Sequence, residues 1–232
     1  MHNNKTVLVT GGNRGIGLGL VSACLNQSYT VACTCRDQTA LPQELQQHIG
    51  KSLFVFTLDV LQDSSIKAFA NTIKEKGIVF DYIINSAGIS IDEAYGNWSH
   101  EVFMHSFAVN AVGPAILIQA LHNNLTNGVK VVNLSSGLAS ISSVQNGQDM
   151  YTAYAMSKAA INMLTKQLSH ILCDKQATVV SLNPGWVKTD MGGANATDTV
   201  DYACAKMLAL IEQLRTADTG HFIDYDKLEI QF

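Results

Sequence analysis

Apolar runs of strand length alternate with segments of helix length along the whole sequence. The runs are nearly continuous in Val, Ile, Leu and Phe, which is typical of strands buried on both faces of a parallel sheet. The segments between them are amphipathic, as in 64–76, where Ile66, Phe69 and Ile73 share one stripe. We therefore expect an α/β fold with a doubly wound, mostly parallel seven-stranded sheet and helices on both faces. The expected strands are Thr6–Thr10, Thr30–Cys35, Leu53–Thr57, Tyr82–Asn85, Val129–Leu134, Thr178–Leu182 and Phe222–Asp224.

The composition narrows the classes of partner. Hydrophobic residues make up 47% of the 232 residues and charged residues 15%, so a large core is expected rather than disorder. The net charge of −4 and the lack of any Lys/Arg run argue against binding to nucleic acid. No apolar run approaches the ~20 residues that span a bilayer, and the first residues do not resemble a secretory signal. No membrane association is expected.

The spacing of the cysteines and histidines indicates neither a disulfide framework nor a metal site. The five cysteines are odd in number and have no disulfide or metal-ligand spacing, which favours a reduced, cytoplasmic protein. His100 and His105 are five residues apart, so they do not share a helix face as a zinc-protease motif requires. We expect them to be surface or capping residues, and we expect no metal site.

A glycine-rich loop directly follows the first expected strand. It reads T-G-x-x-x-G-x-G over 10–17, with Gly11, Gly15 and Gly17 as its glycines, and a helical segment comes next. Glycines let the backbone approach a diphosphate closely, and the helix that follows offers free N–H groups and a positive dipole end. A plain glycine-rich turn is the alternative. The strand–glycines–helix order instead favours a dinucleotide-binding, Rossmann-type domain.

The end of the second strand indicates which dinucleotide is preferred. An acidic residue there would accept the ribose 2′-OH of NAD, whereas an arginine would favour the 2′-phosphate of NADP. Arg36 occupies this corner, and Arg14 in the glycine loop offers a second positive charge. Asp37 comes next, with its side chain expected to point elsewhere. NADP(H) is therefore the preferred cofactor and NAD(H) a possible one. The alternative is that both arginines are solvated surface charges that do not contact the cofactor.

A serine, a tyrosine and a lysine follow the fifth strand. Ser136 comes just after the strand, and Tyr154 and Lys158 open a long helix, where positions four apart share a face. An adjacent ammonium favours the phenolate and should lower the tyrosine pKa towards neutral, which suits proton transfer. Ser136 would hydrogen-bond the substrate oxygen. Alone, Tyr-x-x-x-Lys is common by chance, but here it follows a glycine loop in the order that such a site requires.

With these motifs the chain resembles the short-chain dehydrogenase/reductase family over essentially its whole length. The resemblance implies that Asn110 completes the catalytic set of Ser136, Tyr154 and Lys158, by holding a water that links the lysine to solvent. It implies that Asp59 and Val60 contact adenine. The full set of implied cofactor contacts is Gly11, Asn13, Arg14, Gly15, Ile16, Gly17, Arg36, Asp59, Val60, Asn85, Ala87, Gly88, Tyr154, Lys158, Pro184, Gly185, Val187 and Thr189.

Within the family, 183–193 and 220–226 are similar to the C-factor and sniffer-type carbonyl reductases. Ser136 and Tyr154 are eighteen positions apart, where the family more often has thirteen. The extra residues, within 142–150, should form a longer flap near the pocket. If that loop folds differently, Ser135, Ser140 or Ser142 would replace Ser136.

The resemblance implies an NADPH-dependent reductase of aldehyde, ketone or quinone carbonyls, with Tyr154 as proton donor. Two alternatives are an NAD-dependent alcohol dehydrogenase and a C-factor-like signalling or nucleotide-binding protein. We expect one NAD(P)-binding Rossmann domain over 1–232, with substrate loops at about 90–98, 140–150 and 190–200. Helices around 99–124 and 150–172 carry more apolar residues than one face needs, which favours a homodimer or homotetramer.

Overall fold

The computed structural model describes residues 4–37, 41–91, 93–144 and 151–232. Four of the seven strands have the expected bounds, while β4 and β5 begin earlier and β6 ends one residue later. The early part of β5 was missed because Asn127-Gly128 is typical of a turn; the structure instead places it at a register shift, where Phe80 pairs with Leu125 and Tyr82 with Lys130. The strands are β1 (Thr6–Thr10), β2 (Thr30–Cys35), β3 (Leu53–Thr57), β4 (Phe80–Asn85), β5 (Leu125–Leu134), β6 (Thr178–Asn183) and β7 (Phe222–Asp224).

The sheet has the order β3-β2-β1-β4-β5-β6-β7, and all six pairings are parallel. The chain therefore winds outwards from β1 to one edge, returns to the middle, and winds outwards again from β4. The prediction of a doubly wound sheet is confirmed. Strand order reverses between β1 and β4, and ligands in open α/β sheets bind at the carboxyl ends of the strands beside such a switch point.

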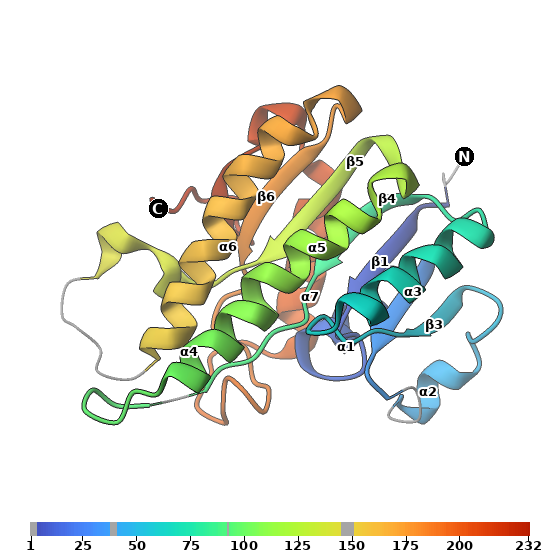
Figure 1. Ribbon diagram of the computed structural model, residues 1–232. Helices are drawn as coiled ribbons and strands as arrows, with labels where there is room; N and C mark the ends of the chain where they lie inside the picture. The colour runs from blue at the N-terminus through green and yellow to red at the C-terminus, as the bar shows by residue number, and fades with distance from the viewer. Residues whose placement is uncertain (1–3, 38–40, 92, 145–150) are drawn as a thin grey trace.

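Helices cover both faces of the sheet, as Figure 1 shows. Helices α1 and α7 contribute to the core on one face, and α3, α5 and α6 contribute to the core on the other. The long helices form where the sequence is amphipathic, and the predicted helix at 64–76 is α3. The helices are α1 (Gly15–Asn26), α2 (Gln43–Gln46), α3 (Asp63–Glu75), α4 (His100–Phe107), α5 (Gly113–Ala120), α6 (Thr152–Ile171) and α7 (Val200–Gln213), with short turns η2 (Ala108–Val112), η3 (His122–Asn124), η4 (Gly137–Ala139), η5 (Ile141–Ser143), η6 (Cys173–Lys175) and η7 (Thr216–Asp218).

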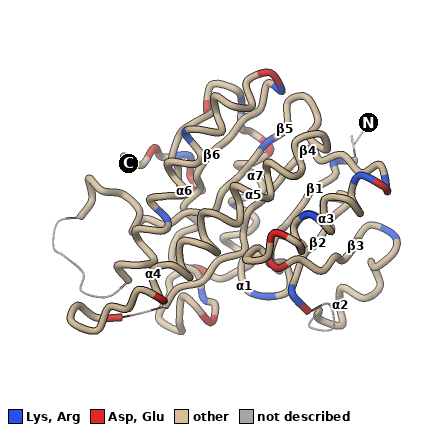
Figure 2. Tube along the Cα trace, in the orientation of Figure 1, with Lys and Arg blue, Asp and Glu red and all other residues tan. Residues whose placement is uncertain are grey.

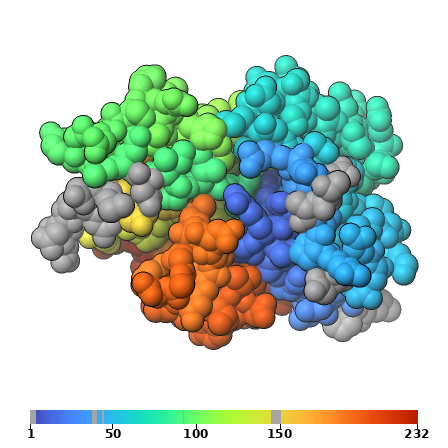
Figure 3. Space-filling view, turned by 90° about the horizontal axis from the view of Figure 1, so that it is seen from below, coloured from blue at the N-terminus to red at the C-terminus, as the bar shows by residue number. Residues whose placement is uncertain are grey.

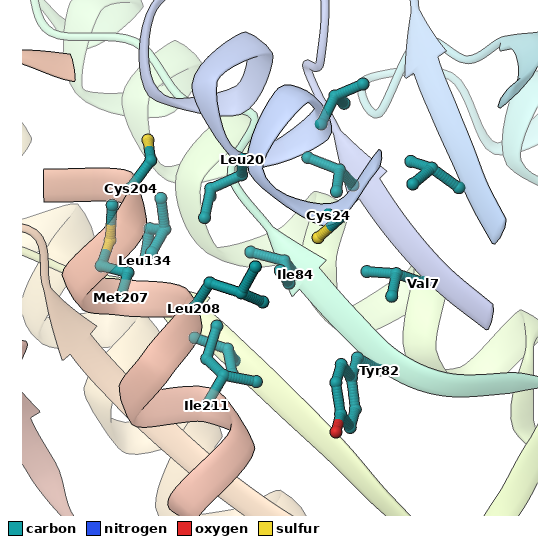
Figure 4. Close-up of a cluster of buried hydrophobic side chains, with 14 of the residues drawn as sticks. Val7, Leu20, Cys24, Tyr82, Ile84, Leu134, Cys204, Met207, Leu208 and Ile211 are labelled. Carbon is teal, nitrogen blue, oxygen red and sulfur yellow. The ribbon is translucent and has the colours of Figure 1, made fainter. Parts of the chain in front are cut away.

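Helices α1 and α7 pack closely against each other over the sheet. Figure 4 shows Leu20 and Cys24 of α1 in one buried cluster with residues of α7, on the same face of the sheet. Gly19 makes this approach possible, because a Cβ there would lie 2.6 Å from Cys204 Sγ and would also meet Val200 Cγ1. Burial of this apolar surface stabilises the layer by about 25 cal/mol per Å². The start of α1, where the glycine loop ends, is thereby fixed on the sheet.

Residues His100–Ala120 form one helical stretch that is long and apolar enough to cross a membrane by length and composition, and its most apolar 18-residue window has a mean hydropathy of 1.4. The expectation that no apolar run approaches such a length is therefore wrong. The stretch runs from α4 through η2 to α5, and 44% of its most apolar window is buried inside the protein. Helix α4 packs against α6, and Leu117 and Ile118 of α5 belong to the core. Burial within the fold accounts for part of its apolar character, while Met104 and Val112 of the same stretch are exposed.

Charged side chains are scattered over the described trace, with acidic and basic residues interspersed (Figure 2). All five cysteines are free thiols, and four of them are buried.

Candidate active site

A cleft of about 640 Å³ opens over the carboxyl ends of the strands, beside the switch point between β1 and β4. Loops that follow β1, β2, β3, β4 and β6 line it, together with residues of α4 and α6. Figure 3 shows the blue glycine loop between the green segment that includes α4 and the orange segment after β6. The fold thus brings together segments that are far apart in the sequence, at the place where such sheets bind ligands.

The glycine loop borders this cleft and ends at an uncapped helix. Gly11 has φ +65, and a Cβ there would lie 3.0 Å from Ala87 Cα, so the loops after β1 and β4 touch. Thr10 Oγ1 ties the same two loops, because it accepts hydrogen bonds from the backbone N–H groups of Ser86 and Ala87, at 3.0 Å each. The N-cap of α1, Arg14, makes no side-chain capping bond, and the first turn carries no acidic residue. The free backbone N–H groups in the first turn of α1 therefore suit the phosphates of a dinucleotide.

Two arginines stand at the end of the cleft where the second strand stops. Arg14 and Arg36 both line the cleft and are exposed, and neither forms a salt bridge in the described part of the chain. Asp37 also lines the cleft. It follows Arg36 directly after β2, at the mouth of the cleft. This corner therefore presents both charges.

Tyr154 lines the inner end of the cleft, with Ser136 behind it. Tyr154 lies in the first turn of α6, and Ser136 caps η4. Although Tyr154 as a residue is only half-buried, burial of its hydroxyl raises the pKa, and the nearby Ser136 hydroxyl partly opposes this rise. The expected lowering of the tyrosine pKa by Lys158 is therefore wrong: burial dominates.

Lys158 lies one turn further along α6 and is buried. Its Nζ donates to the Leu134 carbonyl at 2.8 Å and lies 5.7 Å from the centroid of the Tyr154 ring. Burial lowers its pKa from 10.5 to about 8. A Cβ on Gly88 would lie 3.5 Å from this Nζ, so a glycine here leaves room for the lysine beside the cleft.

Asn110 lies in η2, a single π-helical turn between α4 and α5, and is buried. Its Nδ2 donates to Ile89 O and to Ser157 Oγ, and its Oδ1 accepts from Ile89 N, all at 2.9 Å. Ser157 Oγ in turn donates to Tyr154 O at 2.7 Å. The asparagine thus braces the loop after β4 against the start of α6. Such π turns occur frequently at functional sites.

The three alternative serines lie elsewhere. Ser135 is buried and donates to Asn162 Oδ1 at 2.7 Å, although it also contributes to the cleft wall. Ser140 is buried and donates to Gln231 O at 2.6 Å, and Ser142 contacts Ser140 Oγ at 3.1 Å. Of the four serines, Ser136 is the one whose hydroxyl influences the pKa of Tyr154. The end of the expected flap, 145–150, lies outside the described residues.

Asn183, at the end of β6, fixes the loop that carries Pro184 and Gly185. Its Oδ1 accepts from Gly185 N at 3.3 Å and from Gly137 N at 3.2 Å, so it also holds the turn after Ser136. Gly185 has φ +77, and a Cβ there would crowd Asp198 and Tyr225. Further along the loop, Thr189 Cγ2 would lie 3.4 Å from a Cβ on Gly15. The loop therefore closes over the glycine loop.

Most of the expected site residues line the cleft, and the others lie just behind its wall. His105 on α4 is exposed, as expected, and it also lines the cleft, which sequence reasoning did not foresee. Sequence reasoning also missed the bracing side chains of Thr10, Ser157 and Asn183, although each stands directly beside a motif residue. Expected residues in the wall are Gly11, Asn13, Arg14, Gly15, Ile16, Gly17, Arg36, Asp59, Val60, Ala87, Gly88, Tyr154, Lys158, Pro184 and Thr189; those behind it are Asn85, Asn110, Ser136, Gly185 and Val187.

A phosphate cradle at the switch point of a parallel sheet, with a tyrosine and a buried lysine at its inner end, defines a dinucleotide-dependent oxidoreductase. Residues 5–199 match the model of the family described as short chain dehydrogenase. The chain belongs to this family and is a short-chain dehydrogenase/reductase.

Known proteins similar to the chain include carbonyl reductases. The structure is similar to the NADPH-bound carbonyl reductase from chicken fatty liver, with a TM-score of 0.89 and 35% identity over 98% of this chain and 99% of that one. It is also similar to the carbonyl reductase Sniffer of D. melanogaster, with a TM-score of 0.90 and 29% identity over 99% of both chains. The C-signal of Myxococcus xanthus is 33% identical over 168 residues, which is 71% of this chain and 99% of that protein.

Proposed function

We propose that the chain is an NADPH-dependent reductase of aldehyde, ketone or quinone carbonyls, with Tyr154 as the proton donor. The observation that carries the proposal is the placement of Tyr154 beside the buried Lys158, with Nζ 5.7 Å from the ring centroid, in the wall of the cleft that the glycine loop borders. A carbonyl oxygen that accepts hydrogen bonds from the Tyr154 and Ser136 hydroxyls would be held where a proton can reach it.

NADP(H) is the preferred cofactor in this proposal, and NAD(H) a possible second one. Two exposed guanidinium groups, of Arg14 and Arg36, border the cleft, and guanidinium matches the geometry of a phosphate. Asp37 at the same corner would repel a phosphate unless the arginines outweigh it. The similar carbonyl reductase from chicken fatty liver is described as NADPH-bound, which supports the same choice.

The reduced nicotinamide supplies the hydride when bound, and the protein supplies the proton. Ser136 orients the substrate oxygen and stabilises the alkoxide that develops on it. Tyr154 gives up its phenolic proton to that oxygen. Lys158, fixed by Leu134 O, retains two N–H donors for the ribose hydroxyls and for proton return to the tyrosine. Asn110 has one Oδ1 lone pair left after its three hydrogen bonds, and in this proposal it holds the water of the relay.

The raised pKa of Tyr154 suits its proposed role in reduction. A proton donor must be protonated at working pH, and burial keeps the phenol in that form. The same group would act as the base in alcohol oxidation, so the case against an NAD-dependent dehydrogenase rests on Arg14 and Arg36 at the cofactor corner.

Tyr154→Phe tests the proposal. The variant should still bind NADPH, because the glycine loop and the arginines remain, while turnover of 4-nitrobenzaldehyde or 1,4-naphthoquinone should fall by at least about a hundredfold. NADPH fluorescence measures binding, and loss of NADPH absorbance measures turnover. Tyr151→Phe is the matched control, since Tyr151 has Ala155 rather than a lysine four residues later. Wild-type turnover in Tyr154→Phe would refute the assigned role.

The similarity to C-signal favours a second candidate, a signalling or nucleotide-binding protein. A pure nucleotide binder does not need a buried lysine hydrogen-bonded beside a tyrosine, and such a charge is costly to bury. Tight NADPH binding without turnover of any carbonyl in an aldehyde, ketone and quinone panel would favour this candidate.

The substrate loops and the assembly complete the proposal. Loops at about 90–98, 140–150 and 190–200 would form the substrate pocket of a single NAD(P)-binding domain over 1–232. Exposed apolar side chains on two neighbouring helical stretches, among them Met104, Val112, Met156 and Met163, support a homodimer or homotetramer. Size-exclusion chromatography with light scattering tests the assembly.

A further inference from the structure

The turn that follows Ser136 is anchored at its far end by a buried hydroxyl. Ser140, the residue after η4, is 1% exposed, and its Oγ donates to the Gln231 carbonyl at 2.6 Å. A hydroxyl has one proton to donate, so the contacts of this oxygen with Ser142 Oγ (3.1 Å) and Ser143 Oγ (2.8 Å) are ones in which Ser140 accepts. Ser140 therefore binds the turn to a segment about ninety positions later.

That later segment, the return segment 228–232, folds back along β7. Asp224 N donates to Leu228 O at 3.0 Å and Ile230 N donates to Phe222 O at 2.8 Å, so the backbone runs antiparallel to the last strand. Phe232 stacks on the buried Phe222, with ring centroids 6.1 Å apart and an interplanar angle of 29°. The return segment is thus fixed to the sheet edge by both backbone and side chain.

The turn 137–140 has little freedom between its anchors. At its start, Gly137 N donates to Asn183 Oδ1 at 3.2 Å. Within it, Ala139 N donates to Ser136 O at 2.9 Å and Leu138 N donates to Ser136 Oγ at 3.2 Å. The direction of the Ser136 hydroxyl therefore depends on where this turn lies. Just beyond it, Ser142 N donates to Phe232 O at 3.3 Å, which gives the return segment a second hold.

We propose that Ser140, held by the return segment 228–232, is a positioning residue that keeps the Ser136 hydroxyl in register with Tyr154. The inference rests on the proposed function, because it acts through Ser136. Catalytic groups lose efficiency steeply with misplacement, and a shift of about 1 Å from a distant change can cost a hundredfold in rate. Loss of one anchor of a short turn is a change of this kind.

Ser140→Ala, alone and combined with Ser136→Ala, tests the proposal. With 4-nitrobenzaldehyde and NADPH, we expect Ser140→Ala to lower kcat about tenfold while the Kd for NADPH changes less than about twofold. In the Ser136→Ala background the same change should cost less than about twofold, because the group that it positions is already absent. Ser169→Ala is the matched control: its Oγ also donates to a main-chain carbonyl, at 2.7 Å, on α6 away from the cleft.

Two further variants, Phe232→Ala and Ser140→Thr, distinguish a loss of positioning from misfolding of Ser140→Ala. Phe232 is partly exposed, and its loss should reproduce the fall in kcat by loosening the return segment. Ser140→Thr keeps the hydroxyl and should restore at least half of the lost turnover. An unchanged kcat in Ser140→Ala, or a tenfold loss that persists in the Ser136→Ala background, would overturn the inference and leave the proposed function standing. Wild-type turnover in Ser136→Ala would instead overturn the role of Ser136 in the proposed function.

Discussion

The Nζ of Lys158 lies in the interior, with Leu134 O as its partner at 2.8 Å. Burial lowers its pKa from 10.5 to about 8, which means that the folded state disfavours the ammonium relative to the unfolded chain. In the unfolded chain the lysine binds its proton more tightly, so below about pH 8 the fold carries the full cost of the charge. That cost is relieved as the pH rises from about 8 towards 10.5.

We therefore expect Lys158→Met to abolish turnover and to raise the free energy of unfolding at pH 7. The gain should be at most on the order of 3 kcal/mol, at about 1.4 kcal/mol per pKa unit, and the lost bond to Leu134 O offsets part of it. The difference from wild type should shrink above pH 8. Urea unfolding across this pH range measures it, with the exposed Lys166→Met as control. A large loss of stability at pH 7 would contradict the linkage argument.

Arg36 offers a second prediction at this scale. It borders the cleft without a salt bridge in the described part of the chain, so its guanidinium is available to a phosphate. Removing one charge-assisted contact should weaken NADPH binding about ten- to a hundredfold in Arg36→Ala and leave NADH binding nearly unchanged. Titration by nucleotide fluorescence measures both affinities. Arg215→Ala, remote from the cleft, is the control; equal losses for NADPH and NADH would show that Arg36 does not read the 2′-phosphate.

At the scale of elements, Gly19 sets the distance between α1 and α7. In a helix Ala is favoured over Gly by about 1 kcal/mol, but a Cβ here would lie 2.6 Å from Cys204 Sγ and would also meet Val200. Overpacking of a close helix contact costs about 1–3 kcal/mol, so the packing effect should win.

Gly19→Ala should thus lower the free energy of unfolding by up to about 2 kcal/mol, as measured by thermal or urea denaturation. Cys204→Ala in the same chain should recover part of the loss, because it removes one of the two crowded atoms. If Gly19→Ala proves more stable than wild type, the helices have room to separate and the packing argument fails.

Elements with a strong apolar pattern were predictable, and their exceptions have local causes. The buried strands and α3 follow from their periodicity alone. The early part of β5 was not foreseen because Asn127-Gly128 is typical of a turn, and the pairing of Leu125 with Phe80 across a register shift is a tertiary effect. The π turn at Asn110 was likewise invisible, since its geometry arises from contacts with Ile89 and Ser157.

Over the whole molecule, local motifs predicted the cleft but not its electrostatics. The glycine loop, Arg36, Tyr154 and Lys158 each lie where strand order and helix spacing place them. The pKa of Tyr154 could not be foreseen, because it depends on burial by segments distant in sequence. The same holds for Asp37 and His105 as wall residues, because which residues line the cleft depends on segments distant in sequence.

The uncapped start of α1 has a consequence for the lifetime of the protein. A side-chain cap contributes about 1 kcal/mol to the stability of a helix, and α1 has no such cap at its start. An anion that binds at the start of α1 would accept hydrogen bonds from its free N–H groups. A ligand that binds only the native state stabilises it, and the stabilisation grows with the ligand concentration. Resistance of this enzyme to heat and to proteases would then rise and fall with the total concentration of its nucleotide, oxidised or reduced, because the phosphates that dock at the helix are the same in both forms.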